Sequence, residues 1–188
     1  MKFDFRNSFE TALPYADFLS KHALPKDQDR WARVVNAVSL TDAQRQLLDS
    51  FRRRMPVLVM AGAWCGDCVK QCPILQHFAD ATPLIELRFV DRDANRDLAD
   101  NLMLMGSPRV PQAVFFNEDL LFVARYGDRT LSQYRDLNER LSGAACATGI
   151  VAPNDPAQAK IVDEWLGEFE RVQWLLRTSP SLRERHGD

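Results

Sequence analysis

The sequence lacks three features that would assign it to well-known classes of protein: a long apolar run, a strong charge of one sign and a dense set of cysteines. No stretch approaches the roughly 18 apolar residues that a membrane-spanning helix requires. The first residues, Met1 to Arg6, carry charges where a secretory signal needs an apolar core. The formal net charge of -2 provides no long-range field for nucleic acid or an anionic membrane. We therefore expect a cytoplasmic protein with neither nucleic acid nor a membrane as a partner.

Cysteine is scarce and unevenly distributed. The chain has 4 cysteines among 188 residues, of which Cys65, Cys68 and Cys72 lie close together while Cys146 stands apart. In a reducing compartment, such a cluster indicates catalysis or metal binding rather than a disulfide framework. The composition is otherwise that of a globular domain, with 46% apolar and 27% charged residues.

The hydrophobic pattern divides the chain into three parts. Residues 1–54 predict a helical N-terminal extension, residues 55–142 a core that contains strands, and residues 143–188 a linker followed by an amphipathic helix. We expect all three to form one compact domain, because 188 residues suffice for one sizeable core but not for two ordinary domains.

The N-terminal extension predicts three helices. The first runs from Ser8, as its cap, to about Lys21, and the second begins at Pro25. The third begins at Thr41, because Thr41 and Gln44 have the spacing of a capping box. We expect Arg52-Arg53-Arg54, at the end of this helix, to form a solvated face or to accompany the helix C-terminus rather than to bind a ligand.

The core alternates between strands and helices. Its first strand is a continuous apolar run, which is typical of a strand buried on both faces. Two strands near the end surround a short polar turn, which is the pattern of a hairpin. This order predicts two parallel crossovers followed by a hairpin, and hence a mixed α/β sheet. The expected strands are 56–61, 84–90, 112–116 and 120–126, and the expected helices are 66–79, a segment capped by Asp91 to Asp93 and reaching Met103, and 131–141.

The last part of the chain begins with a segment rich in Gly, Ala, Pro and Asn, from Ser142 to Pro156, which predicts a linker. Apolar residues then recur at helical spacing from Ile161 to Leu176. The apolar face of this helix either packs on the chain's own core or forms a homodimer interface, and the pattern leaves both alternatives open.

Two of the clustered cysteines, Cys65 and Cys68, stand where the first strand turns into a helix. A thiolate at a helix N-terminus faces unpaired backbone N–H groups and the positive end of the helix dipole, which lower its pKa. The spacing of three residues lets the second sulfur reach the first. We expect Cys65, nearer the exposed turn, to be the nucleophile and Cys68 to resolve the mixed disulfide. Gly66 and Asp67 between them would shape the ring and tune its redox behaviour.

A metal site is the main chemical alternative, because zinc half-sites share the same cysteine spacing. Cys72 could be a third ligand, since it lies four residues after Cys68 on the same helical face. A fourth ligand is missing: His77 points to the opposite side of the helix, and His22, His186 and Cys146 are distant in sequence. We therefore expect neither a metal nor another cofactor. Cys72 is either an inert buried residue or a reserve thiol that exchanges with Cys68.

Four features in order resemble the thioredoxin superfamily. Trp64-Cys65-Gly66-Asp67-Cys68 is similar to the family's Trp-Cys-Gly-Pro-Cys motif, with Asp67 in place of the proline. Pro73 corresponds to a helix-kinking proline, and Val110-Pro111 resembles the family's cis-proline before a hairpin strand. Gly127 follows the last strand, where the family also has a glycine. The resemblance covers about Met55 to Leu141.

This resemblance implies a thioredoxin-like three-layer α/β fold, in which helices flank a central mixed sheet, with extra helices at both termini. It also implies a thiol–disulfide oxidoreductase that reduces protein or small-molecule disulfides. The electron donor would be a reductase or a low-molecular-weight thiol. The family pattern assigns site-shaping and substrate-binding roles beside the redox pair to Trp64, Gly66, Asp67, Arg109, Val110 and Pro111. Trp64 could instead be plain core. The Val110-Pro111 bond should be cis, with its loop facing the two sulfurs.

The departures from the family pattern limit what the resemblance implies. Val59 stands where thioredoxin has a buried aspartate that accepts a proton. Arg109 replaces a glycine beside the cis-proline, where it either attracts acidic groups or is solvated. The charge of Asp67 opposes thiolate formation at Cys65 and predicts a less acidic nucleophile and a reducing protein. A non-catalytic adaptor, whose helical extensions bind a partner protein, is the second functional alternative.

Overall fold

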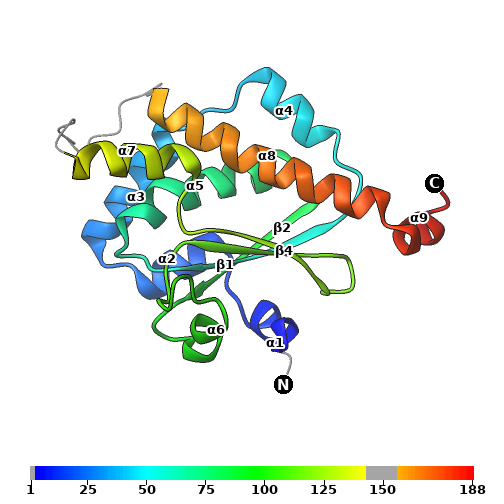
Figure 1. Cartoon of the computed structure of the whole chain (residues 1–188), viewed down its shortest axis with the longest axis horizontal. Coiled ribbons are helices and arrows are strands. Elements are labelled where there is room, and N and C mark those ends of the chain that lie inside the picture. Colours follow the sequence, from blue (N-terminus) through cyan, green and yellow to red (C-terminus); the bar gives the residue numbers. More distant parts are fainter. Residues whose placement is uncertain (1–2, 143–155) are drawn as a thin grey trace.

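The computed structural model describes residues 3–142 and 156–188, and it shows a four-stranded sheet between layers of helices (Figure 1). The strands lie in the order β2-β1-β3-β4. β2 is parallel to β1, whereas β3 is antiparallel to both β1 and β4. The predicted three-layer α/β fold with a mixed sheet is confirmed. The strands are β1 (Met55–Ala61), β2 (Ile85–Asp91), β3 (Gln112–Phe116) and β4 (Phe122–Gly127).

The expectation of two parallel crossovers is wrong, because only the connection from β1 through α5 (Gly66–Ala81) to β2 is parallel. The next helix, α6 (Arg96–Asn101), has 6 residues and rises only about 9 Å. A strand of seven residues spans about 23 Å, so α6 cannot return the chain to the other end of the sheet. The residues between α6 and β3 do not cross back either, and β3 starts from the end where β2 stops and runs antiparallel to β1.

Helices cover both faces of this sheet. Figure 1 shows α5, α7 and α8 over one face, and α1 and α6 on the other. None of the helices in the described residues is long and apolar enough to cross a membrane. The remaining helices are α1 (Phe5–Glu10), α2 (Tyr15–His22), α3 (Pro25–Ala37), α4 (Asp42–Asp49), α7 (Leu131–Leu141), α8 (Pro156–Thr178) and α9 (Pro180–His186).

The predicted first helix from Ser8 to Lys21 is wrong, because the chain forms two helices, α1 and α2, with an extended segment between them. Pro14 disfavours helical conformation in the residue before it. Leu13 accordingly pairs with Phe89 at the outer edge of β2, through backbone hydrogen bonds of 2.9 and 2.7 Å. The break in the helix thus protects an edge of the sheet that would otherwise be open.

The third expected helix, α4, starts as its sequence predicts. The Thr41 hydroxyl accepts the Gln44 backbone N–H at 3.2 Å, and the Gln44 side chain accepts the Thr41 N–H at 2.8 Å, which completes the capping box. The helix expected after Asp91 is shorter than predicted. The Asp91 carboxylate accepts the N–H groups of Asp93 and Ala94 in a turn, and α6 begins only at Arg96.

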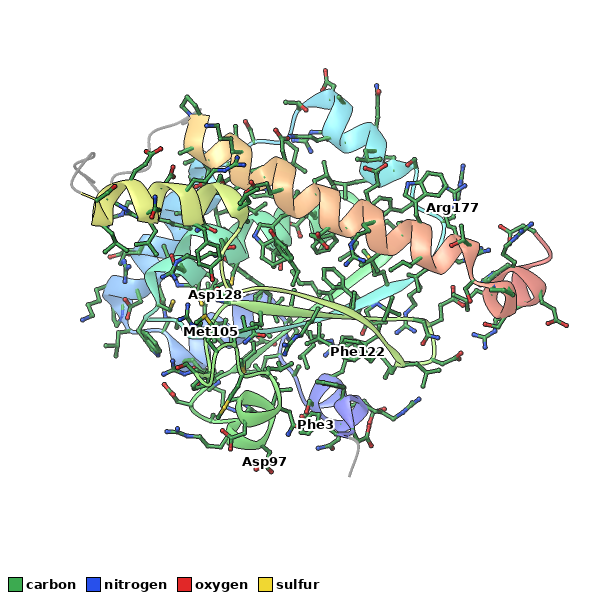
Figure 2. The ribbon with its side chains drawn as sticks, in the orientation of Figure 1. Phe3, Asp97, Met105, Phe122, Asp128 and Arg177 are labelled. Carbon is green, nitrogen blue, oxygen red and sulfur yellow. The ribbon has the colours of Figure 1, made fainter. Side chains whose placement is uncertain are left out.

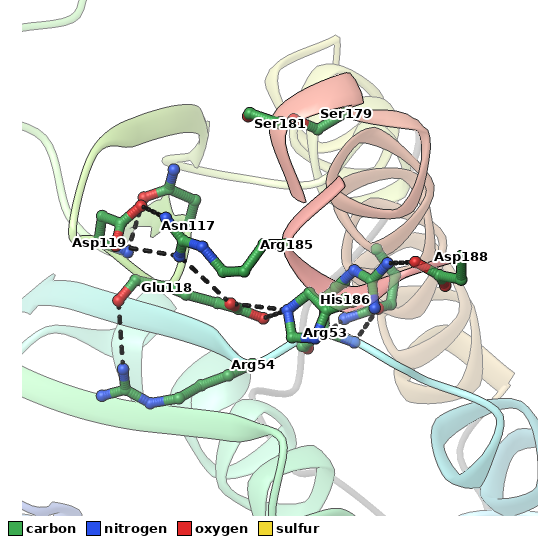
Figure 3. A network of polar contacts seen from close by, with 11 residues as sticks. Arg53, Arg54, Asn117, Glu118, Asp119, Ser179, Ser181, Arg185, His186 and Asp188 are labelled. Atoms are coloured by element: carbon green, nitrogen blue, oxygen red, sulfur yellow. Dashed lines mark hydrogen bonds and ion pairs between the residues drawn. The ribbon is translucent and has the colours of Figure 1, made fainter. Parts of the chain in front are cut away.

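The expectation of a solvated face for the three arginines is wrong for Arg53, whose side chain is 4% exposed and forms an ion pair with Asp188. The Gln173 side chain on α8 accepts the backbone N–H groups of Arg52 and Arg53. Figure 3 shows how α9, which the sequence pattern does not predict, brings Asp188 to this place. Arg185 and His186 in α9 also contact the β3–β4 turn at Asp119 and Glu118, respectively.

The apolar face of α8 packs on the chain's own core, as the first of the two alternatives for this helix requires. Trp165 and Phe169 are fully buried. The Phe169 ring lies 5.3 Å from that of Phe78 on α5 and 5.1 Å from that of Phe115 on β3. A homodimer through α8 stays a prediction, and it would depend on the exposed side chains Trp174 and Leu175.

The helices before and after the sheet share its hydrophobic core. Buried residues of α3, α4 and α8 belong to the same apolar cluster as β1, all of whose residues are buried. The division of the chain at residues 54 and 142 stays a prediction. The predicted linker between Ser142 and Pro156, with Cys146, lies almost entirely outside the described residues.

Candidate active site

The two cysteines of the motif occupy different environments at the start of α5. Cys65 is the N-cap residue of the helix and is half-buried, whereas Cys68 lies one turn inside and is fully buried. The backbone holds this turn in place, because the Cys65 N–H donates to the Gly62 carbonyl at 2.9 Å and the Cys65 carbonyl accepts the Val69 N–H at 3.0 Å. Both cysteines are free thiols. Of the pair, only Cys65 is partly accessible from outside.

The surroundings of the two sulfurs raise their pKa values. For Cys65, the hydrogen bond with the Cys68 sulfur raises the pKa most, followed by burial, while the backbone N–H groups of Cys68 and Asp67 act in the opposite direction. Burial raises the pKa of Cys68. The Gly62 N–H donates to the Cys68 sulfur at 3.4 Å, and this hydrogen bond acts to lower the pKa of Cys68. The direction predicted for Cys65 therefore agrees with the structure, but the cause is the second sulfur and burial rather than the Asp67 carboxylate.

The loop before β3 faces the cysteine pair. The Val110–Pro111 peptide bond is cis, as the resemblance predicts. The Val110 carbonyl oxygen lies 3.8 Å from the Cys65 sulfur. The Gln112 side chain fixes the loop from inside, since its amide donates to the carbonyls of Leu102 at 2.6 Å and Arg109 at 2.8 Å.

Gly127, at the end of β4, allows the chain to approach the cis-proline closely. Gly127 pairs with Gln112 across the β3–β4 ladder and has a φ of 132°. A Cβ atom here would lie 2.3 Å from the Pro111 carbonyl oxygen, a separation that real side chains do not show. Glycine is thus required here for two reasons: its φ is unfavourable for other residues, and the Pro111 carbonyl leaves no room for a side chain.

Trp64 is not a core residue, because 49% of it is exposed. Its indole covers Gly62, where an added Cβ would lie 2.9 Å from the ring, and the Arg92 guanidinium lies 4.7 Å from the ring centroid. The Trp64 carbonyl accepts a hydrogen bond from Arg30 on α3 at 3.4 Å. The alternative that Trp64 is plain core is therefore wrong, and its role as a cover of the redox pair stays a prediction.

Asp67 and Arg109 belong to one network of charges that the sequence pattern does not reveal. Asp67 forms an ion pair of 2.5 Å with Arg129, and Arg109 forms one of 3.4 Å with Asp128. Arg129 also lies 3.6 Å from Asp128, and the Tyr134 hydroxyl donates to the same carboxylate. Figure 2 shows Asp128 at the end of β4, below the start of α7. Plain solvation of Arg109 is therefore wrong.

Asp128 is the centre of this network. Its side chain is 4% exposed. Burial opposes ionisation, but hydrogen bonds from Tyr134, from its own backbone N–H and from Arg109, together with the charge of Arg129, hold the pKa of Asp128 below its usual range. Sequence reasoning missed Asp128, Arg129 and Tyr134. Their only signal in the sequence is that they follow Gly127, which matches the family pattern.

Both helical extensions contribute contacts that hold the backbone near the cysteine motif. Gln71 on α5 donates to the Asp128 carbonyl at 2.9 Å and accepts the indole N–H of Trp165 on α8 at 2.8 Å. On the other side, the indole N–H of Trp31 on α3 donates to the Ala63 carbonyl at 2.8 Å. The extensions thus hold the loops on both sides of the cysteine motif.

Cys72, the third cysteine of the cluster, and Val59, which stands where thioredoxin has an aspartate, lie in the core near the pair. Cys72 and Val59 are both fully buried, and the Cys72 thiol makes a hydrogen bond with the Cys68 sulfur that raises the pKa of Cys68. The described residues contain no group of three or more His, Cys, Asp or Glu side chains that could hold a metal ion. His77 instead contacts the Val35 carbonyl on α3 at 3.0 Å. The metal alternative therefore has no ligand set in this part of the chain.

A groove of about 780 Å³ lies away from the cysteines. Its lining includes Phe3, Leu121 and Phe122. Figure 2 shows Phe3 and Phe122 on the far side of the sheet from Asp128. Neither Cys65 nor Cys68 lines this groove.

Comparisons with known proteins agree with this arrangement. A family model described as Thioredoxin matches residues 13–136. A protein of unknown function from Pseudomonas aeruginosa has a similar structure, with 18% identity and a TM-score of 0.72 over 91% of this chain and 97% of its own. An HIV epitope-scaffold is similar at 21% identity and a TM-score of 0.68, over 90% of this chain and 97% of its own. Fasciola hepatica thioredoxin is 25% identical over 50% of this chain and 88% of its own, with a TM-score of 0.36. No curated protein matches the chain.

The two structures that match almost the whole chain show that the helices outside the core also belong to a shared fold. The family match begins within the N-terminal extension and ends in α7, so it includes the cysteine motif, the cis-proline and Gly127. This match covers more than half of the chain. The chain belongs to the thioredoxin family.

Proposed function

We propose that this chain is a thiol–disulfide oxidoreductase that reduces protein or small-molecule disulfides. The observation that carries this proposal is the asymmetry of the cysteine pair. Cys65 is accessible at a helix N-terminus and faces the cis Val110–Pro111 loop, while Cys68 is fully buried one turn behind it. Membership of the thioredoxin family supports the same chemistry.

In the first step, the Cys65 thiolate attacks one sulfur of the substrate disulfide. The substrate S–S bond breaks, a mixed disulfide with Cys65 forms, and the other substrate sulfur leaves as a thiolate and takes up a proton. In the second step, Cys68 loses its proton and attacks the Cys65 sulfur. The Cys65–Cys68 disulfide forms, and the second substrate thiol is released. The substrate gains two electrons and two protons, and the protein is oxidised.

The surface around Cys65 suits an incoming disulfide. Gly66 is exposed, and a Cβ added there would meet only the Arg30 guanidinium at 3.7 Å, so the approach to the sulfur is open. In this proposal, the Val110–Pro111 loop holds the extended backbone of the substrate, and the exposed face of Trp64 covers one side. Arg109 and Asp67 set the charge around the site.

The cycle needs an electron donor, because the oxidised pair must return to two thiols. A reductase or a low-molecular-weight thiol would supply the two electrons, and no cofactor is required, since the cysteine sulfurs carry the whole redox change. We expect the protein to act in the cytoplasm, where such donors keep thiols reduced. Nucleic acid and membranes are not expected partners.

Reduction of insulin disulfides by dithiothreitol, followed as turbidity, tests the proposal. The wild-type protein should accelerate the reaction, and Cys65→Ser should abolish the acceleration. Arg177→Ala is the control: it removes a side chain from the last turn of α8, far from Asp128 in Figure 2, and should leave the rate unchanged. Cys68→Ser should hold a substrate as a stable mixed disulfide on Cys65, which mass spectrometry would identify. Equal rates for wild type and Cys65→Ser would end the enzyme hypothesis and favour the adaptor.

A further inference from the structure

Asp67 places a negative charge within the cysteine motif, and this charge has one close partner. Asp67 is in the first turn of α5, one residue before Cys68. The side chains of Asp67 and Arg129 are 24% and 25% exposed, and their ion pair of 2.5 Å is charge-assisted and partly shielded from water. Among the described residues, no other cation lies within ion-pair distance of this carboxylate.

Arg129 is itself held from behind. The buried Asp128 carboxylate lies 3.6 Å from its guanidinium, and the Tyr134 ring centroid lies 5.9 Å from it. The Asp128 backbone is fixed in turn by the amide of Gln71, which is hydrogen-bonded to Trp165. The position of Arg129 is therefore determined by the core and by α8, and its guanidinium is fixed before any substrate arrives.

We propose that Arg129 is a positioning residue of the redox site, which pairs with the Asp67 carboxylate so that its negative charge does not oppose ionisation of the Cys65 thiol. This inference rests on the proposed function, because it concerns the nucleophile of that reaction. The charges of the network balance, with Asp67 and Asp128 against Arg109 and Arg129. Loss of Arg129 leaves the Asp67 carboxylate, two residues along the chain from the attacking Cys65, without its ion-pair partner.

The size of the effect follows from Coulomb's law. A charge several ångströms from a half-buried thiol changes its ionisation by an amount that corresponds to a roughly three- to tenfold change in thiolate population below the pKa. Because the thiolate is the reactive form, the rate of alkylation of Cys65 should change by the same factor. A role in folding alone would not produce this selective change.

Iodoacetamide labelling of Cys65 in the reduced full-length protein, measured peptide by peptide with mass spectrometry between pH 6 and pH 10, tests the inference. At pH 7, Arg129→Ala should lower the labelling rate about three- to tenfold, and Arg129→Lys should restore most of it. Asp67→Asn should label at least as fast as wild type. The double variant with Asp67→Asn and Arg129→Ala should also recover, since no carboxylate is left without a partner.

Arg177→Ala is the matched control, because it removes the same charge at the far end of α8 from Asp128 (Figure 2). Circular dichroism of every variant checks that it folds. Labelling of the double variant as slow as that of Arg129→Ala would overturn the inference and indicate a structural role. An unchanged rate in Arg129→Ala would also overturn it. Labelling needs no substrate, so failure of the insulin assay with this labelling pattern intact would refute the proposed function alone.

Discussion

Replacement of Gly127 should displace the cis-proline loop from its place beside Cys65 and destabilise the protein. In Gly127→Ala, the new Cβ would lie 2.3 Å from the Pro111 carbonyl oxygen and 3.0 Å from the Gln112 Cα. Both of these atoms are backbone, so neither can move aside as a flexible side chain would. The φ of 132° is also unfavourable for any residue with a Cβ.

Two costs determine the expected loss of stability. Holding a non-glycine residue at this φ costs about 1–3 kcal/mol. Relieving the overlap requires a backbone shift of roughly 1 Å, and overpacking of this kind costs about 1–3 kcal/mol more. We therefore expect Gly127→Ala to lower the free energy of unfolding by about 2–6 kcal/mol, a large part of the 5–15 kcal/mol that is typical of a domain. Any folded fraction should reduce insulin slowly, because the loop that faces Cys65 is displaced.

Urea unfolding, followed by tryptophan fluorescence and by circular dichroism, measures this loss, and coincidence of the two transitions checks for two-state behaviour. Gly167→Ala is the matched control. Gly167 lies inside α8 with no atom within 4 Å of an added Cβ, so alanine there should stabilise the helix by about 0.5–1 kcal/mol. If Gly127→Ala lost less than about 1 kcal/mol and kept its activity, the steric argument for this glycine would be refuted.

The raised pKa of Cys65 and the hydrogen bond of Trp165 can each be tested separately. Because the Cys68 sulfur and burial raise the pKa of Cys65, its thiolate fraction is small at neutral pH, and its alkylation rate should still rise beyond pH 9; a plateau already reached at pH 7 would contradict this reasoning. Trp165→Phe removes the indole donor to Gln71 and leaves a buried acceptor, which should cost about 1–3 kcal/mol in urea unfolding. Trp174→Phe, at a site that is 51% exposed, should change stability by less than about 0.5 kcal/mol, and equal losses in the two variants would refute the role of the Trp165 hydrogen bond.

Local patterns predicted most elements of the fold. The capping box at Thr41, the apolar run of β1 and the hairpin around Asn117 each depend on neighbouring residues, and each is found where the sequence places it. The wrong predictions concern longer-range effects. Pro14 is a local signal for the break between α1 and α2, but pairing with Phe89 is what holds Leu13 extended there. Contacts of Arg185 and His186 with the β3–β4 turn hold α9. Periodicity within one segment carries no information about such partners.

The sequence predicted the cysteines and the cis-proline of the candidate site but not its network of charges. The motif spacing located Cys65 and Cys68, and the family resemblance located the cis-proline and Gly127. Residues that act through charge were missed, since Arg129 and Asp128 have no local pattern that distinguishes them from other surface residues. The family pattern singles out Arg109 but not its partner Asp128, because the ion pair joins two different loops of the chain.

The sequence by itself determined the chemistry available to this protein, because it places two thiols three residues apart at a strand-to-helix turn. Its resemblance to a known family also predicted the fold. Only the tertiary structure decided the environment of those thiols. It buries Cys68 and leaves Cys65 accessible, brings the Val110 carbonyl to the Cys65 sulfur, and pairs Asp67 with Arg129. The physical reason is that reactivity depends on burial and on charges a few ångströms away, and those neighbours come from the loop before β3 and from the connection between β4 and α7, both distant in sequence from the motif.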